Sequence, residues 1–113
     1  MQFAGDLTIR FFVAEGGLAL VRIVVDEAEL LTIAVEPSRR RKGVATALLA
    51  RIEQVLRDCG VASCFLEVEA DNEAAIALYR RFHFNPCSIR EGYYLRGERR
   101  VDAILMQRSF KEV

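Results

Sequence analysis

The chain has 113 residues, a length that fits one domain, residues 1–113, and leaves no room for two. Hydrophobic residues make up 52% of it, enough for a packed core and too many for global disorder. Its 16 basic and 16 acidic residues give a formal net charge of zero. That balance argues against a protein that coats nucleic acid or an anionic membrane.

Targeting and metal signals are lacking in the sequence. No apolar run approaches the roughly 20 residues of a membrane span, and residues 1–6 lack the basic and apolar segments of a secretory signal. The cysteines Cys59, Cys64 and Cys87 are odd in number and lack metal-site spacing. With a single histidine in the chain, they indicate reduced thiols in a cytoplasmic protein without a bound metal.

The first half of the chain predicts three strands and a helix. The strands are expected where β-branched and aromatic residues gather between turn signals, over 7–14, 18–25 and 29–35. A helix is expected over 42–59, with Gly60 as its stop. Its apolar residues share one face: Val44, Leu48, Leu49, Ile52, Val55 and Leu56.

The second half alternates strands and helices. The expected elements are a strand over 62–69, a helix over 73–82, and two closing strands over 84–90 and 101–108. Asp71 or Asn72 can cap the second helix, and the polar segment 91–100 is expected to be a loop between the closing strands. This order of elements predicts an α/β (α+β) fold in which helices flank a mixed central sheet.

The junction between the third strand and the first helix is a candidate anion site. An apolar run ends at Pro37, and a basic segment, 39–42, leads to Gly43 at the start of the helix. Free N–H groups and the positive end of the helix dipole favour phosphate at such a place. Glycine also lets the backbone approach a ligand without a Cβ in the way. A solvated basic turn is the alternative that the spacing leaves open.

Glu67 and Tyr79 are candidates for acid–base chemistry. Alternation places Glu67 on the face of its strand opposite Leu66 and Val68. A half-buried carboxylate there can act as a general base, and a solvated one needs no such role. Tyr79 lies two turns after Asn72 on an apolar helix, where a phenol either packs in the core or protonates a leaving group.

These motifs occur together, and in the same order, in one family. They are Ile33-Ala34-Val35-Glu36-Pro37, Arg40-Arg41-Lys42-Gly43-Val44-Ala45, Leu66-Glu67-Val68, Asn72, Ala75 to Tyr79, and Phe84. From about Leu18 to Met106 the chain resembles the GCN5-related N-acetyltransferases (GNAT). Within that family it most resembles the ribosomal-protein-alanine N-acetyltransferases, of which the later Tyr93-Tyr94 and Asp102-Ala103-Ile104 are also typical.

The resemblance implies the GNAT acyl-CoA N-acyltransferase fold and a specific reaction. The enzyme would move an acetyl group from acetyl-CoA to an amine, in the first place the N-terminal α-amine of a protein such as a ribosomal protein. Glu67 would take the proton from the amine, and Tyr79 would protonate the departing thiolate. Acetyl-CoA would be the cosubstrate. Its pantetheine arm would be bound by Ile33, Ala34 and Val35, and Asn72 would make a further hydrogen bond to the coenzyme. Its pyrophosphate would be bound by the start of the helix, at Arg41, Lys42, Gly43, Val44, Ala45 and Thr46.

The chain departs from the family pattern in several places. The strand and two helices that usually precede the first hairpin have no counterpart in the few residues before Leu7. We therefore expect exposed apolar surface that a homodimer would cover. His83 stands where glycine is usual. Two alternatives stay open: an acetyltransferase for a small-molecule amine, and a non-catalytic acyl-CoA-binding or interaction module.

Overall fold

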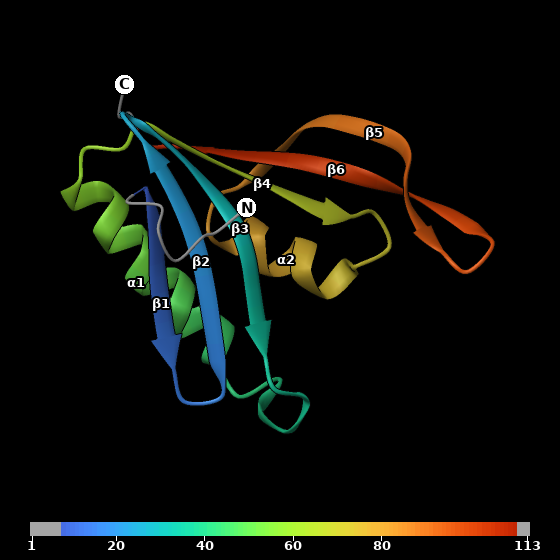
Figure 1. Ribbon diagram of the computed structural model, residues 1–113, viewed down its shortest axis with the longest axis horizontal. Coiled ribbons are helices and arrows are strands. Elements are labelled where there is room, and N and C mark those ends of the chain that lie inside the picture. The colour runs from blue at the N-terminus through green and yellow to red at the C-terminus, as the bar shows by residue number, and fades with distance from the viewer. Residues whose placement is uncertain (1–7, 111–113) are drawn as a thin grey trace. The chain divides into compact units, whose positions relative to one another are not determined.

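A computed structural model describes residues 8–110 (Figure 1). These residues fall into two compact units. The first unit runs up to Cys64 and includes Phe110, and the second unit is Phe65–Ser109. Residues 1–6, where the sequence shows no secretory signal, and Leu7, the start of the first predicted strand, lie outside the described residues. That the whole chain forms one domain stays a prediction.

The first unit consists of three strands and one long helix. Its elements are β1 (Ile9–Ala14), β2 (Gly17–Val24), β3 (Glu27–Val35), the short 3-10 helix η2 (Pro37–Arg39) and α1 (Val44–Asp58). Both strand pairs are antiparallel, and α1 packs along the three strands (Figure 1). These elements match the predictions with small shifts at their ends, except that η2 was not predicted.

Local sequence signals explain the bounds of α1. Its buried residues come from the predicted apolar face: Leu48, Leu49, Ile52 and Leu56. The helix begins after Gly43, whose φ is 80°, and ends just before Gly60, whose φ is 73°. Both glycines adopt the left-handed region that other residues avoid. Gly60 is thus confirmed as the predicted stop.

An apolar face of the first unit is exposed. Phe12 is buried, with the guanidinium of Arg51 in α1 6.0 Å from its ring centroid. Its neighbours Phe11 and Val13 therefore point to the other face of β1, where they are 58% and 67% exposed and lie opposite residues of β2. A homodimer that covers this face stays a prediction.

The second unit contains the remaining strands and helix. Its elements are β4 (Ser63–Glu69, which begins at the boundary of the first unit), α2 (Glu73–Arg81), β5 (Asn85–Arg96) and β6 (Arg99–Ser109), and β6 lies between β4 and β5. Of the two predicted caps of α2, Asn72 is the one used: its Oδ1 accepts a hydrogen bond from the N–H of Ala75 at 3.2 Å. At the other end, Arg108 Nη1 donates to the carbonyl of Phe82 at 2.9 Å.

The prediction of a loop over 91–100 is wrong. These residues extend β5 and β6 into a long antiparallel hairpin whose turn is Gly97 and Glu98 (Figure 1). No residue of β5 is fully buried, so no apolar alternation marks this strand in the sequence. It is a strand because its backbone pairs with β6. The same hairpin also begins at Asn85, later than the predicted start at residue 84.

Candidate active site

The start of α1 has the backbone geometry of an anion site. Gly43 is the N-cap with a φ of 80°, and Arg41 also adopts a positive φ, 64°. The first N–H groups of the helix, from Val44 onward, have no intrahelical acceptor, and no side chain caps them. Consecutive N–H groups in such a turn form a concave surface that binds anions.

The space beside Gly43 is open. A Cβ added at Gly43 would have no heavy atom within 4 Å among the described residues, and Arg41 and Lys42 beside it are exposed. A phosphate can therefore reach the backbone here, and a side chain at position 43 would occupy that space. The residues present fit the pyrophosphate that the resemblance implies, although binding by Arg41 to Thr46 stays a prediction.

A hollow of about 410 Å³ adjoins the end of β3. Two of the residues predicted to bind the pantetheine arm, Ala34 and Val35, line it, while Ile33 precedes them in β3. The β1–β2 turn supplies part of the remaining wall, including Gly16 and Gly17. Backbone groups at the end of β3 thus border space on the protein surface, as binding of an extended chain requires.

The segment that leads into the basic loop is tied to the β1–β2 turn. The N–H of Glu36 donates to the carbonyl of Gly16 at 2.8 Å. Arg39 Nη2 lies 2.7 Å from Glu15 Oε1, and its side chain covers Gly16 so closely that an added Cβ would lie 2.6 Å from Arg39 Cγ. The sequence did not indicate this contact, because it joins segments that are far apart in the chain.

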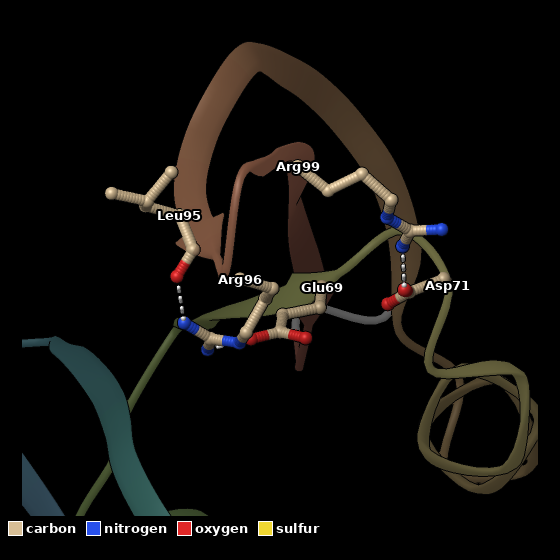
Figure 2. A network of polar contacts seen from close by, with 5 residues as sticks. All are labelled: Glu69, Asp71, Leu95, Arg96 and Arg99. Atoms are coloured by element: carbon tan, nitrogen blue, oxygen red, sulfur yellow. Dashed lines mark hydrogen bonds and ion pairs between the residues drawn. The ribbon is translucent and has the colours of Figure 1, made fainter.

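In the second unit, carboxylates from β4 and the turn after it each have an arginine partner. The side chain of Glu67 is 24% exposed, and its Oε1 lies 3.6 Å from Nη1 of Arg90 in β5. Glu69, on the same face of β4, forms an ion pair with Arg96 (Figure 2). Asp71 follows β4 and pairs with Arg99 at 2.9 Å. Glu67 is thus half-buried, the environment that its predicted role requires.

A bulge in the β5–β6 hairpin shapes the surface beside Glu67. Arg90 pairs with Ala103 and Tyr94 with Val101, so the three residues 91–93 face Asp102 alone. Gly92 has a φ of 58°, and its N–H donates to Asp102 Oδ1 at 2.8 Å. Bulges bend a strand and redirect its side chains. Here the bulge immediately precedes Tyr94 and contains Tyr93.

Tyr94 lies within the electrostatic field of Glu67. Burial raises the pKa of the Tyr94 phenol, the negative charge of Glu67 and the neighbouring Tyr93 raise it further, and Arg90 opposes the change. Sequence reasoning did not assign Arg90, Arg96 or Asp102 to the site. Their positions depend on the hairpin register, which no local pattern reveals.

Tyr79, the other predicted catalytic residue, is buried in the second unit. Its ring meets that of Phe84 edge to face, with centroids 6.0 Å apart. Burial raises the pKa of its phenol, which keeps the group protonated as a proton donor. Asn72 uses its Oδ1 to cap α2, so its amide NH₂ is the group that can donate to a coenzyme. The roles of Glu67, Tyr79 and Asn72 stay predictions.

Two further findings concern residues 8–110. No group of three or more His, Cys, Asp and Glu side chains in this range is placed to hold a metal ion. No helix formed by these residues is long and apolar enough to cross a membrane.

Comparisons with known proteins identify relatives of the chain. Residues 9–84 match the acetyltransferase (GNAT) family. The ribosomal protein bS18-alanine N-acetyltransferase of Escherichia coli (strain K12) is 42% identical over 106 residues, which cover 90% of this chain and 72% of that protein. An N-alpha-acetyltransferase of Saccharolobus solfataricus is 40% identical over 86 residues, 75% of this chain and 50% of that protein.

Solved structures show the same fold. The ribosomal-protein-S18-alanine N-acetyltransferase from Escherichia coli matches with a TM-score of 0.89 and 38% identity, covering 96% of this chain and 73% of that one. Ard1 from Thermoplasma volcanium matches with a TM-score of 0.76 and 30% identity, covering 85% and 64%. The α/β fold that the order of elements predicts and the family resemblance are both confirmed.

Proposed function

Because this chain belongs to the acetyltransferase (GNAT) family, we propose that it transfers the acetyl group of acetyl-CoA to the N-terminal α-amine of a protein, with a ribosomal protein as the candidate acceptor. The observation that carries the proposal is 42% identity, over 90% of the chain, to an enzyme named for that reaction. The residues that match the family, 9–84, include Gly43, Glu67 and Tyr79.

The acid–base chemistry favours an α-amine as the acceptor. An amine must be neutral to attack a thioester carbonyl. The α-amino group of a peptide has a pKa of about 8 and a lysine side chain one of about 10.4, a difference of roughly 3 kcal/mol in the cost of deprotonation. A carboxylate base such as Glu67 is adequate for the first amine and poorly matched to the second.

Each proton has a defined path in the transfer. Glu67 takes a proton from the acceptor ammonium, directly or through a water molecule, and the amine nitrogen then forms a bond to the thioester carbon. A backbone N–H near Val35 stabilises the negative charge that develops on the oxygen. The carbon–sulfur bond breaks as Tyr79 donates its phenolic proton to the CoA thiolate. The second proton that the nitrogen loses on becoming an amide then restores the Tyr79 phenol, directly or through water. A phenol is protonated at neutral pH, and burial, which raises the pKa of Tyr79, keeps it so.

The chain's own residues hold the cosubstrate in this scheme. Backbone groups of Ile33, Ala34 and Val35 pair with the acetyl-pantetheine arm beside the hollow at the end of β3. The N–H groups from Arg41 to Thr46 surround the pyrophosphate at the open, uncapped start of α1.

A peptide acetylation assay tests the proposal. The acceptor is a short peptide with an N-terminal alanine and an internal lysine, and the control is the same peptide with a blocked N-terminus. We expect mass spectrometry to find one acetyl group on the α-amine of the first peptide and none on the second. The variant Glu67→Gln should lose on the order of 10²-fold or more in kcat.

Other outcomes would support the alternatives. Acetylation of a simple primary amine but of neither peptide would make the protein a small-molecule acetyltransferase. Tight binding of acetyl-CoA without turnover on any acceptor would make it a non-catalytic acyl-CoA-binding module.

A further inference from the structure

Six side chains of the second unit form a continuous series of contacts that begins and ends on β4. Glu67 pairs with Arg90, whose guanidinium carbon lies 5.3 Å from the ring centroid of Tyr93. The rings of Tyr93 and Tyr94 meet edge to face at 5.2 Å. Arg96 lies over Tyr94 at 5.0 Å and pairs with Glu69 (Figure 2).

We propose that Arg90 and Arg96 are positioning residues for the acceptor side of the acetyl transfer. Each of them holds one carboxylate of β4 and one ring of the tyrosine pair at the same time. Together they fix the surface on which an acceptor amine meets Glu67. The kinetic part of this inference rests on the proposed function, whereas its structural part does not.

Arginine suits this double contact. The edge of a guanidinium can face a carboxylate while its flat face lies on an aromatic ring. Arg96 donates a hydrogen bond to Glu69 in this way, whereas Arg90 attracts Glu67 by charge alone. A lysine ammonium carries the same charge but cannot use an edge and a face at once.

The bulge explains why such a restraint is needed. Residues 91–93 all face Asp102, so the backbone around Tyr93 lacks regular ladder pairing. Arg90 reaches β4 across β6, where its partner is the fully buried and small Ala103. The two arginines thus supply through side chains the restraint that strand pairing gives elsewhere.

The geometry at Glu67 also leaves the carboxylate free to act. The 3.6 Å between Arg90 Nη1 and Glu67 Oε1 is within reach of charge attraction but too long for a hydrogen bond. Arg90 therefore attracts the Glu67 carboxylate by charge without a hydrogen bond, and the lone pairs of Glu67 remain available to accept a proton from an amine.

The hairpin offers a matched control for these two arginines. Arg99 also pairs with a carboxylate, Asp71, but it has no ring contact among the described residues. Both members of this pair are more than half exposed, at 71% and 51%, whereas Glu67 and Glu69 are 24% and 23% exposed. Exposed ion pairs contribute little to stability. Removing Arg99 should therefore leave Tyr93 and Tyr94 in place.

Near-UV circular dichroism tests the structural part, because the chain has three tyrosines and no tryptophan. We expect the tyrosine bands to change in Arg90→Gln and in Arg96→Gln and to stay as in the wild type in Arg99→Gln. Arg90→Lys keeps the charge and should change the spectrum in the same direction as Arg90→Gln. Wild-type spectra in both glutamine variants, or an equal change in Arg99→Gln, would overturn the inference.

Steady-state kinetics with the alanine peptide test the acceptor side. In Arg90→Gln and Arg96→Gln, KM for the peptide should rise on the order of tenfold, with KM for acetyl-CoA unchanged. A loss confined to acetyl-CoA binding would contradict a role on the acceptor side.

Because the spectra need no turnover, failure of the proposed function is distinguishable from failure of this inference. A variant that fails to fold, detected by its thermal unfolding, is replaced by the lysine variant at the same position.

Discussion

Gly43 and Gly60 stand at opposite ends of α1 with nearly the same backbone. Their φ values are 80° and 73°, and a Cβ on either would have no heavy atom within 4 Å among the described residues. A left-handed φ costs a residue with a Cβ roughly 1–2 kcal/mol. Adding a Cβ therefore introduces the same strain at either position, and the two differ in that only Gly43 lies at the proposed pyrophosphate site.

Comparing Gly43→Ala with Gly60→Ala separates strain from ligand binding. We expect both variants to lose about 1 kcal/mol of unfolding free energy, and only Gly43→Ala to weaken acetyl-CoA binding, by about tenfold or more in calorimetry, because its methyl group occupies the phosphate position. Lys42→Ala should weaken binding less, since one exposed charge contributes little. A larger effect of Lys42→Ala than of Gly43→Ala would instead indicate a simple basic patch.

The sequence was informative where structure is local. The apolar face of α1 and its stop at Gly60 lie within one stretch of chain, so periodicity and glycine predicted them. Strand β5 has no such signal: its residues are exposed or half-buried, and its pairing with β6 makes it a strand. A long-range contact replaces the local pattern there.

The residues of the candidate site also divide into those that local sequence reveals and those that it does not. The residue pattern marks Gly43, Glu67 and Tyr79 as candidates, and the family resemblance assigns a role to each of them. Arg90 came from no motif, because its contact with Glu67 crosses β6 and depends on the register at the bulge. Register and side-chain reach across strands follow from the folded hairpin, not from spacing along the chain.

Tyr79 should make stability depend on pH in alkaline solution. Burial raises the pKa of its phenol above the ordinary value of 10.0 in the folded protein. Below pH 10 the group is neutral in both states. As the pH rises beyond that, the unfolded chain releases the proton first, so the free energy of unfolding falls. In urea unfolding between about pH 8 and 11, Tyr79→Phe should lose less stability than the wild type, and parallel curves would contradict this origin.

His83 carries a backbone conformation that suits glycine. It follows α2 with a φ of 66°, and its side chain is exposed. Replacing it by glycine removes the left-handed strain at the cost of some chain entropy, so His83→Gly should stabilise the protein by about 0.5–1 kcal/mol. His83→Ala keeps the strain and serves as the control. Equal stabilities of the two variants in urea would show that φ at this position carries no cost.

Gly17 is a glycine for a steric reason. A Cβ on this residue, the first of β2, would lie 2.7 Å from Val44 Cγ1 and 3.3 Å from Leu48 Cδ1, both in the first turns of α1. Overpacking of this kind costs about 1–3 kcal/mol, so Gly17→Ala should lower the free energy of unfolding by that amount. Shortening the facing side chain removes the nearest clash. The double variant Gly17→Ala/Val44→Ala should therefore be more stable than the sum of the single changes predicts, by about 1 kcal/mol in a double-mutant cycle. Strict additivity would mean that positions 17 and 44 do not compete for this space. The contact between them would then not be what fixes the start of α1, where the proposed coenzyme site lies.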